Sequence, residues 1–290
     1  MALTEVRQEF VEPFMEGLSM VSSAWQAGYT IRRDDVASWK MASMSGIGAV
    51  PQWDGSNDVT TADINDRYNT TVAYTKYALQ ARINKYDRKD LPGITQDAGV
   101  KLGVSAMSTY ATVAAGLLNN AFGTTQAGDG VALCSDSHPT ATSARDNAMT
   151  SAFDRTCYFA ARSLARNWVS YHGIPENWAD DGMHVYGSSQ DATLEETFAE
   201  VFGSAYSSSE MQVNAAAGLN ATPQLWEYLT DSTRVFFVSK RRSPLVFWIR
   251  SGVETNVNID QDNLNDKITI DFAIGVQVRP DPVGIIGTDS

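Results

Sequence analysis

The sequence has few of the residues that metal sites and nucleophilic catalysis most often use. It contains two cysteines and three histidines among 290 residues. Two cysteines are too few for a disulfide framework or for a zinc site of four thiolates, and a reducing compartment suits such a chain. Gly-x-Ser-x-Gly, Gly-x-Gly-x-x-Gly and Gly-Lys-Ser/Thr elements are all missing. These absences argue against the serine hydrolases and nucleotide-binding enzymes that such motifs mark.

Basic residues are also scarce. The chain has 22 lysines and arginines against 34 acidic residues, a net charge of −12. Its dense basic stretches are Arg32-Arg33 and 240–242 (KRR). Proteins that bind nucleic acid tightly use clustered positive charge to displace counterions from phosphates. The composition therefore predicts weak, sequence-blind contact with DNA at most.

No segment has the pattern of a membrane span or a signal peptide. The most apolar stretch, 100–118, is interrupted by Lys101 and by several serines and threonines. The first twelve residues carry charges of both signs instead of an apolar run. With 43% hydrophobic residues the chain still has enough apolar side chains for a sizeable core. We expect a protein without membrane contact, made in a reducing cytoplasm.

The first third of the chain predicts a helix followed by an extended arm. Apolar residues recur at helical spacing from Thr4 to about Trp25, although Pro13 lies inside that range. A Gly- and Ser-rich stretch follows. Residues 66–88 then alternate β-forming and polar side chains, yet they are too polar for a central strand. We predict a half-exposed hairpin that projects from the body, with 53–64 as its outgoing limb and 66–88 as its return limb.

The middle of the chain predicts three helices. The longest covers 93–121, with one apolar stripe that we expect to pack in the core. A second runs from Ser143 to Tyr171 and has Cys157 as a small buried residue. A third begins at Thr193, with Glu196 as the partner in a capping box. The stripe of the long helix consists of Val100, Val104, Met107, Ala111, Ala114 and Leu118.

The last part of the chain predicts strands. Residues 235–238 and 245–249 are short apolar runs separated by a turn-prone segment. Residues 268–278 alternate apolar and polar without a break, which is typical of a strand with one buried face. Helices followed by strands, without a repeat, indicate an α+β fold.

Two groups of residues could be read as sites, and we assign neither. Cys134, Asp136 and His138 offer fewer ligands than a zinc site needs, and Ser135 with His138 lacks a third group to orient the histidine. Asp260, Asp262 and Asp266 begin like a calcium loop but lack its central glycine and closing glutamate. We therefore predict no catalytic residues, no cofactor-binding residues, no metal ligands and no cofactor.

Three strings, in order, resemble the major capsid proteins of tailed bacteriophages, in particular the group similar to the phage Mu major head subunit. They are WDG at 53–55, DGVALCSDSHP at 129–139, and LTD at 229–231 followed by VFFVS at 235–239 and SPL at 243–245. The resemblance implies the Johnson fold: an N-terminal arm, an extended β-hairpin called the E-loop, a peripheral domain with a long spine helix, and an axial α/β domain. The implied divisions are 1–45 (arm), 46–90 (E-loop), 91–121 (spine helix of the peripheral domain), 122–262 (axial domain), 263–279 (return strand of the peripheral domain) and 280–290 (C-terminal tail).

The resemblance also implies a function. It predicts a structural protein, not an enzyme, that assembles with itself into hexamers and pentamers of an icosahedral shell around double-stranded DNA, in a virion built in the bacterial cytoplasm. Portal and decoration proteins are implied partners. Some relatives carry a scaffolding segment before the arm, and because this sequence does not, we expect a separate scaffolding protein. The alternatives are an encapsulin-like nanocompartment shell protein and a cytosolic α+β enzyme that uses the Ser135–His138 loop.

Overall fold

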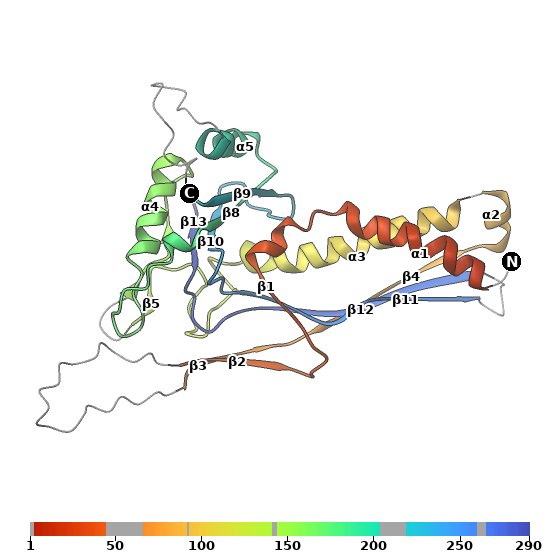
Figure 1. Cartoon of the computed structure of the whole chain (residues 1–290), viewed down its shortest axis with the longest axis horizontal. Coiled ribbons are helices and arrows are strands. Elements are labelled where there is room, and N and C mark those ends of the chain that lie inside the picture. The colour runs from red at the N-terminus through yellow and green to blue at the C-terminus, as the bar shows by residue number, and fades with distance from the viewer. Residues whose placement is uncertain (1–2, 45–65, 92, 141–143, 204–218, 260–264) are drawn as a thin grey trace, which may run out of the picture.

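The computed structural model describes residues 3–44, 66–91, 93–140, 144–203, 219–259 and 265–290 (Figure 1). These residues build two main sheets, and the chain passes from one to the other more than once. A four-stranded sheet has the order β1-β11-β12-β4, and a five-stranded sheet has the order β7-β13-β10-β8-β9. Two small pairs, β2-β3 and β5-β6, complete the strands of this part of the chain, with β5 at His138–Pro139. The predicted α+β class is confirmed.

The four-stranded sheet forms the long part of the molecule. Its strands are β1 (Thr30–Arg33), β11 (Leu245–Ile259), β12 (Asp266–Val278) and β4 (Thr75–Ile83). Strand β1 is parallel to β11, and the other neighbours are antiparallel. The strand predicted at 268–278 is confirmed as β12. Its even-numbered apolar side chains are buried toward the helices from Ile268 to Ile274, while Asp271 on the other face is exposed.

Helices α1 (Leu3–Met20) and α3 (Ile94–Asn119) lie side by side on one face of this sheet (Figure 1). They approach closely because glycines replace side chains at the contact. A Cβ on Gly103 would overlap the Phe14 carbonyl, and a Cβ on Gly17 would overlap the Val100 carbonyl. The short helix α2 (Lys85–Asp90) precedes α3 at the distal end.

The burial of α3 differs in part from the predicted stripe. Ala111, Ala114 and Leu118 are buried as expected, but Val100, Val104 and Met107 are only partly buried. A single stripe was wrong because α3 contacts two partners at different angles. Gly99 and Gly103 of α3 face α1. On another side of the helix, Tyr110 stacks on Phe247 of β11 and packs against Phe272 of β12.

The five-stranded sheet contains β7 (Ala148–Met149), β13 (Ile285–Thr288), β10 (Val235–Ser239), β8 (Met183–Ser188) and β9 (Ala221–Trp226). One face packs under α4 (Arg155–Arg166) and α5 (Ala192–Phe198), through side chains such as Val185 and Phe237. The opposite face packs on the N-terminal segment. There the 3-10 helix η1 (Ala24–Gly28) places Trp25 parallel to Trp226, with ring centroids 5.9 Å apart. A further 3-10 turn covers Ala179–Asp181, and a wide π-type turn, Ala199–Gly203, extends α5.

The helix predicted from Ser143 to Tyr171 is too long. The helix α4 starts after Asp154, whose side chain accepts a hydrogen bond from the Cys157 N–H. The residues before it form β6 (Ala144–Arg145) and β7, because the Asp146 side chain accepts from the Ala148 N–H and closes a local turn. The helix ends at Arg166, well before Gly173.

Two further predictions at the C-terminal side need correction. The third helix is capped by Asp191, which accepts from the Thr193 N–H, and not by Thr193. The segment called a C-terminal tail, 280–290, contains the fully buried strand β13 between β7 and β10. Its short apolar run has no alternation because both of its faces are covered.

The hairpin differs most from the prediction. Strand β3 (Asp66–Val72) pairs with β2 (Trp39–Met44), while the outgoing limb predicted at 53–64 lies outside the described residues. The return limb ends at Val72, because β4 pairs with β12 in the four-stranded sheet. The link between β3 and β4 passes close to β12 at Gly275, where a Cβ would overlap the Ala73 carbonyl. Tyr77 on β4 then stacks on Phe272.

Candidate assembly site at the base of the hairpin

The β2-β3 hairpin lies on the face of the four-stranded sheet opposite to α1 and α3 (Figure 1). Its base is held by a buried apolar cluster. Met41 and Val72 of the hairpin pack against Val246 and Trp248 of β11. These two β11 residues alternate with Leu245 and Phe247, which face the helices. Alternate side chains of β11 therefore pack against α3 on one face of the sheet and against the hairpin on the other.

Polar contacts at the same base fix the register of this packing. The Trp248 indole N–H lies 3.2 Å from the Asp34 carbonyl oxygen and donates to it. Thr70 donates its hydroxyl proton to the Val278 carbonyl at 3.2 Å. Tyr74 stands edge-on to the Trp248 ring, with centroids 6.1 Å apart. The hairpin is thus attached to the four-stranded sheet by its inner half.

A second attachment joins the hairpin to the unit built on the five-stranded sheet. The Arg67 guanidinium lies over the Tyr171 ring, 3.4 Å from its centroid, and over the Tyr68 ring at 4.3 Å. It donates to the Pro139 carbonyl at 2.8 Å and to the Tyr68 hydroxyl at 2.9 Å. A planar guanidinium can stack and donate hydrogen bonds at the same time, so all these contacts are compatible.

The loop at 129–139, which the sequence marked as a shared string, forms a buried polar core behind Pro139. The His138 side chain is fully buried, with Nδ1 2.7 Å from an Asp129 carboxylate oxygen and Nε2 3.2 Å from Asn147 Oδ1. Burial by itself would raise the pKa of Asp129, but hydrogen bonds from His138 and from the Val131 N–H outweigh it and lower that pKa. The core therefore holds an ionised aspartate without exposing it to solvent.

Asn147 connects this core to the five-stranded sheet. Its Nδ2 donates to the carbonyls of Leu133, at 2.8 Å, and Ile285, at 3.2 Å. Its Oδ1 accepts from the Ser135 N–H at 2.8 Å. These contacts fix the orientation of the amide and tie the loop to β13.

The chemistry of the loop does not fit the enzyme alternative. The Ser135 hydroxyl is paired with that of Ser137 at 2.9 Å, and the contacts of His138 go to Asp129, Leu133 and Asn147. Cys134 is buried, and burial raises the pKa of its thiol, which disfavours a thiolate. Ser135 and His138 therefore do not form the pair that nucleophilic catalysis needs.

The metal candidates are not brought together either. Within the described part of the chain, no three Cys, His, Asp or Glu residues are grouped as metal ligands. Of the aspartates considered for calcium, Asp260 and Asp262 lie outside the described residues. Asp266 is buried and pairs with Arg88, 2.7 Å from Nη1.

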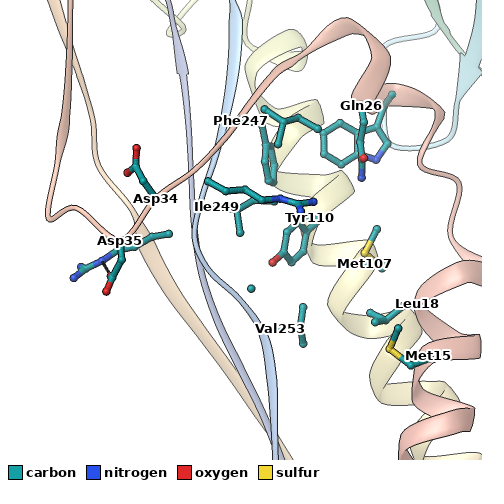
Figure 2. Close-up of a pocket in the computed structure, with 15 residues that line it drawn as sticks. Met15, Leu18, Gln26, Asp34, Asp35, Met107, Tyr110, Phe247, Ile249 and Val253 are labelled. Carbon is teal, nitrogen blue, oxygen red and sulfur yellow. Dashed lines mark hydrogen bonds and ion pairs between the residues drawn. The ribbon is translucent and has the colours of Figure 1, made fainter.

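A groove of about 590 Å³ opens between α1, α3 and β11 (Figure 2). Its walls are mostly apolar, and Met15 is 58% exposed. The charged groups at its rim are partly paired, with Arg250 Nε 3.2 Å from an Asp35 oxygen. The labelled apolar residues are Met15 and Leu18 from α1, Met107 from α3, and Phe247, Ile249 and Val253 from β11.

Solved structures with similar folds are capsid proteins and a related particle. The capsid protein of cyanophage P-SCSP1u superposes with a TM-score of 0.63 at 11% sequence identity, covering 92% of this chain and 88% of the other. The mature capsid of bacteriophage PhiM1 gives 0.60 at 12% identity, with 93% and 87% covered. The virus-like particle from Pyrococcus furiosus gives 0.55 at 11% identity, with 97% and 98% covered. No model of a known protein family matches the sequence, and no curated protein matches it.

These likenesses define a fold class, that of the shell subunits of tailed phages. More specifically, the chain has the Johnson fold, as its sequence strings predicted. None of the helices in the described ranges is long and apolar enough to cross a membrane.

Sequence reasoning missed the residues that attach the hairpin. Arg67 was not singled out, and Asn147 and Tyr171 were placed in a predicted helix. One signal was available: Arg67 stands beside Tyr68 at the start of a strand whose other residues are uncharged after Asp66. Contact between residues 67 and 171 depends on the tertiary path, and no spacing in the sequence reports it.

Proposed function

We propose that this chain is the major capsid protein of a tailed bacteriophage, a structural subunit that assembles with itself into hexamers and pentamers of an icosahedral head around double-stranded DNA. The observation that carries the proposal is a two-stranded hairpin packed outside the four-stranded sheet, on the face away from α1 and α3, within a Johnson fold. An isolated two-stranded hairpin is marginal in water, so a chain that keeps one gains from a neighbouring surface that covers it.

The contacts suggest different divisions from those that the sequence implied. We assign 1–38 to the N-terminal arm and helix, and 39–72 to the E-loop hairpin, because β2 is its outgoing limb. We assign strand β4 to the peripheral domain and not to the E-loop, since it pairs with β12. The final segment joins the axial domain, since β13 lies inside the five-stranded sheet. The peripheral domain then comprises 73–121 and 244–279, and the axial domain 122–243 and 280–290.

The physical logic of such a subunit is many modest contacts. A hairpin lying across a neighbour adds interface area without enlarging the core, and closure of a shell makes each contact effectively intramolecular. No reaction is required of the chain, and the buried His138 core fits a structural role. Scaffolding, portal and decoration proteins are the expected partners, in a virion assembled in the host cytoplasm.

A nanocompartment shell is the second candidate. The virus-like particle from Pyrococcus furiosus matches nearly the full length of both chains, 97% and 98%. That candidate differs in contents and not in fold, since its shell would hold a protein cargo in place of DNA. The size and contents of shells purified from the native host separate the two.

Electron microscopy of the expressed chain tests the shared part of the proposal. We expect closed shells with fivefold and sixfold capsomers, formed by the chain alone or with a scaffolding protein from the same genome. A monomer that stays monodisperse at high concentration with that scaffold present would falsify the capsid function.

A further inference from the structure

We infer that Arg67 is the positioning residue of the hairpin. The Pro139 carbonyl and the Tyr171 ring together contact its guanidinium, and we call these two groups the socket. The contact with the socket sets the direction of β2 and β3 relative to the five-stranded sheet. That this direction matters for assembly rests on the proposed function. The contact itself belongs to the single chain, and its effect on the hairpin is measurable in free subunits.

The backbone at Arg67 is shaped to aim its side chain. Ser43 pairs with Tyr68 and Met44 with Asp66, so Arg67 is the extra residue of a β-bulge in β3. A bulge bends its strand and redirects a side chain away from the regular alternation. This bulge adjoins the outermost described pair of the hairpin, at the opposite end of the ladder from the Trp39–Val72 pair and the apolar cluster beside it. A contact at the outer position controls direction more strongly than one at the inner position.

The socket is itself held in place by buried groups. Pro139 follows His138, whose ring is fixed by Asp129. Arg145 donates to the Val169 carbonyl at 3.1 Å, near Tyr171, and its guanidinium lies over the Trp168 ring at 4.8 Å. The loop at 129–139 thereby has a structural role, because it holds the Pro139 carbonyl in position to accept a hydrogen bond from the hairpin.

The contact also ties the hairpin to a second part of the molecule. The inner attachment joins the hairpin to β11, in the four-stranded sheet, whereas Arg67 reaches Pro139 and Tyr171 in loops of the other unit. Loss of the guanidinium removes a cation–π contact and a hydrogen bond to a carbonyl. The hairpin then keeps its inner attachment and loses its fixed angle to the five-stranded sheet.

Hydrogen exchange on full-length free subunits, at low protein concentration, tests the inference. We expect Arg67→Ala to raise amide exchange in β2 and β3 by about tenfold, the combined effect of the two lost contacts, and to leave β11 and β12 unchanged. Arg67→Lys keeps the charge but not the planar stack, so a smaller increase is expected. Tyr171→Leu should act in the same direction, and the double variant should show less than the product of the single effects. Arg82→Ala, at an exposed arginine on β4, is the matched control.

A distance measurement separates direction from stability. Spin labels at Met44→Cys on the hairpin and Ala160→Cys on α4 occupy exposed positions, while the two native cysteines are buried. The distance distribution should be narrow in the parent chain and clearly broader with Arg67→Ala. Unchanged exchange and an unchanged distribution would overturn the inference, and so would faster exchange throughout the chain, which indicates general destabilisation. Failure of the proposed function appears separately, as a parent chain that forms no shells.

Discussion

Asn147 is fully buried, and its side chain holds together three parts of the backbone. It donates to the carbonyls of Leu133 and Ile285 and accepts from the Ser135 N–H. Removal of the amide takes a side-chain hydrogen bond from each of these groups, although the Leu133 carbonyl keeps its contact with His138 Nε2. The cost of each such buried group is about 1–3 kcal/mol.

We therefore expect Asn147→Ala to lower the free energy of unfolding by about 3 kcal/mol. Urea denaturation followed by tryptophan fluorescence measures the change. Asn256→Ala, at an exposed asparagine on β11, is the control and should change it by less than about 0.5 kcal/mol. Equal changes in the free energy of unfolding for the two substitutions would show that the hydrogen bonds of Asn147 do not stabilise the fold.

His184 on β8 makes stability depend on pH. Burial lowers the pKa of His184 below its ordinary value of 6.5, and the nearby Lys240 lowers it further. The folded chain therefore keeps this histidine neutral, whereas the unfolded chain takes up a proton as pH falls below about 6.5. The unfolded state then binds more protons, so this residue's contribution is fully present above that pH and declines below it.

We expect the stability of the parent chain to fall more steeply than that of His184→Gln between pH 7.5 and pH 5.5. The measurement is urea unfolding at several pH values, and the difference between the two curves isolates His184 from the other histidines. Parallel curves would contradict the assignment. His172→Gln, at an exposed histidine, provides the matched control.

At the scale of elements, the segment that joins the two hairpin strands can be removed without changing the described fold. Met44 and Asp66 are paired across the ladder, so a short Gly/Ser turn can join them in place of residues 45–65. A deletion over 51–85 would be different, because it also removes β4 and uncovers an edge of β12.

The shorter deletion should leave the subunit folded and unable to form shells. We expect its melting temperature to lie within about 3 °C of the parent's, because the described core is untouched. Circular dichroism and electron microscopy report the two outcomes. The 51–85 deletion is the contrast and should melt much lower. Normal shells from the shorter deletion would remove residues 45–65 from the assembly mechanism.

At the scale of the whole molecule, charge governs the relation to DNA. The net charge is −12, and both dense basic stretches are partly neutralised from within. Arg32 pairs with Asp34, and Arg242 pairs with Asp181 at 3.3 Å. Few cations remain to displace counterions from phosphates.

Free subunits should therefore bind duplex DNA no more tightly than roughly 10 µM, without sequence preference, and more weakly still as salt rises from 50 to 200 mM. Fluorescence anisotropy with two unrelated duplexes measures this. Sub-micromolar binding to one duplex at physiological salt would mean that the chain recognises DNA and does not merely enclose it.

The sequence by itself determined the elements whose pattern is local. The alternating strand at 268–278, the long helix predicted at 93–121 and the apolar run at 235–238 could each be recognised as an element, because their patterns lie within one stretch of chain. Three short strings were enough to suggest the Johnson fold, and the absence of catalytic motifs pointed away from an enzyme.

Only the tertiary structure decided how these elements meet. Strand β4 looked like part of the hairpin because both have period two, and its pairing with β12 depends on the crossing at Gly275. Strands β8 and β13 carry no alternation, since both of their faces are covered by distant segments. Arg67 and Tyr171 meet through a fold that brings residues a hundred positions apart into contact. Such pairings are set by packing in three dimensions, and periodicity along one strand carries no information about them.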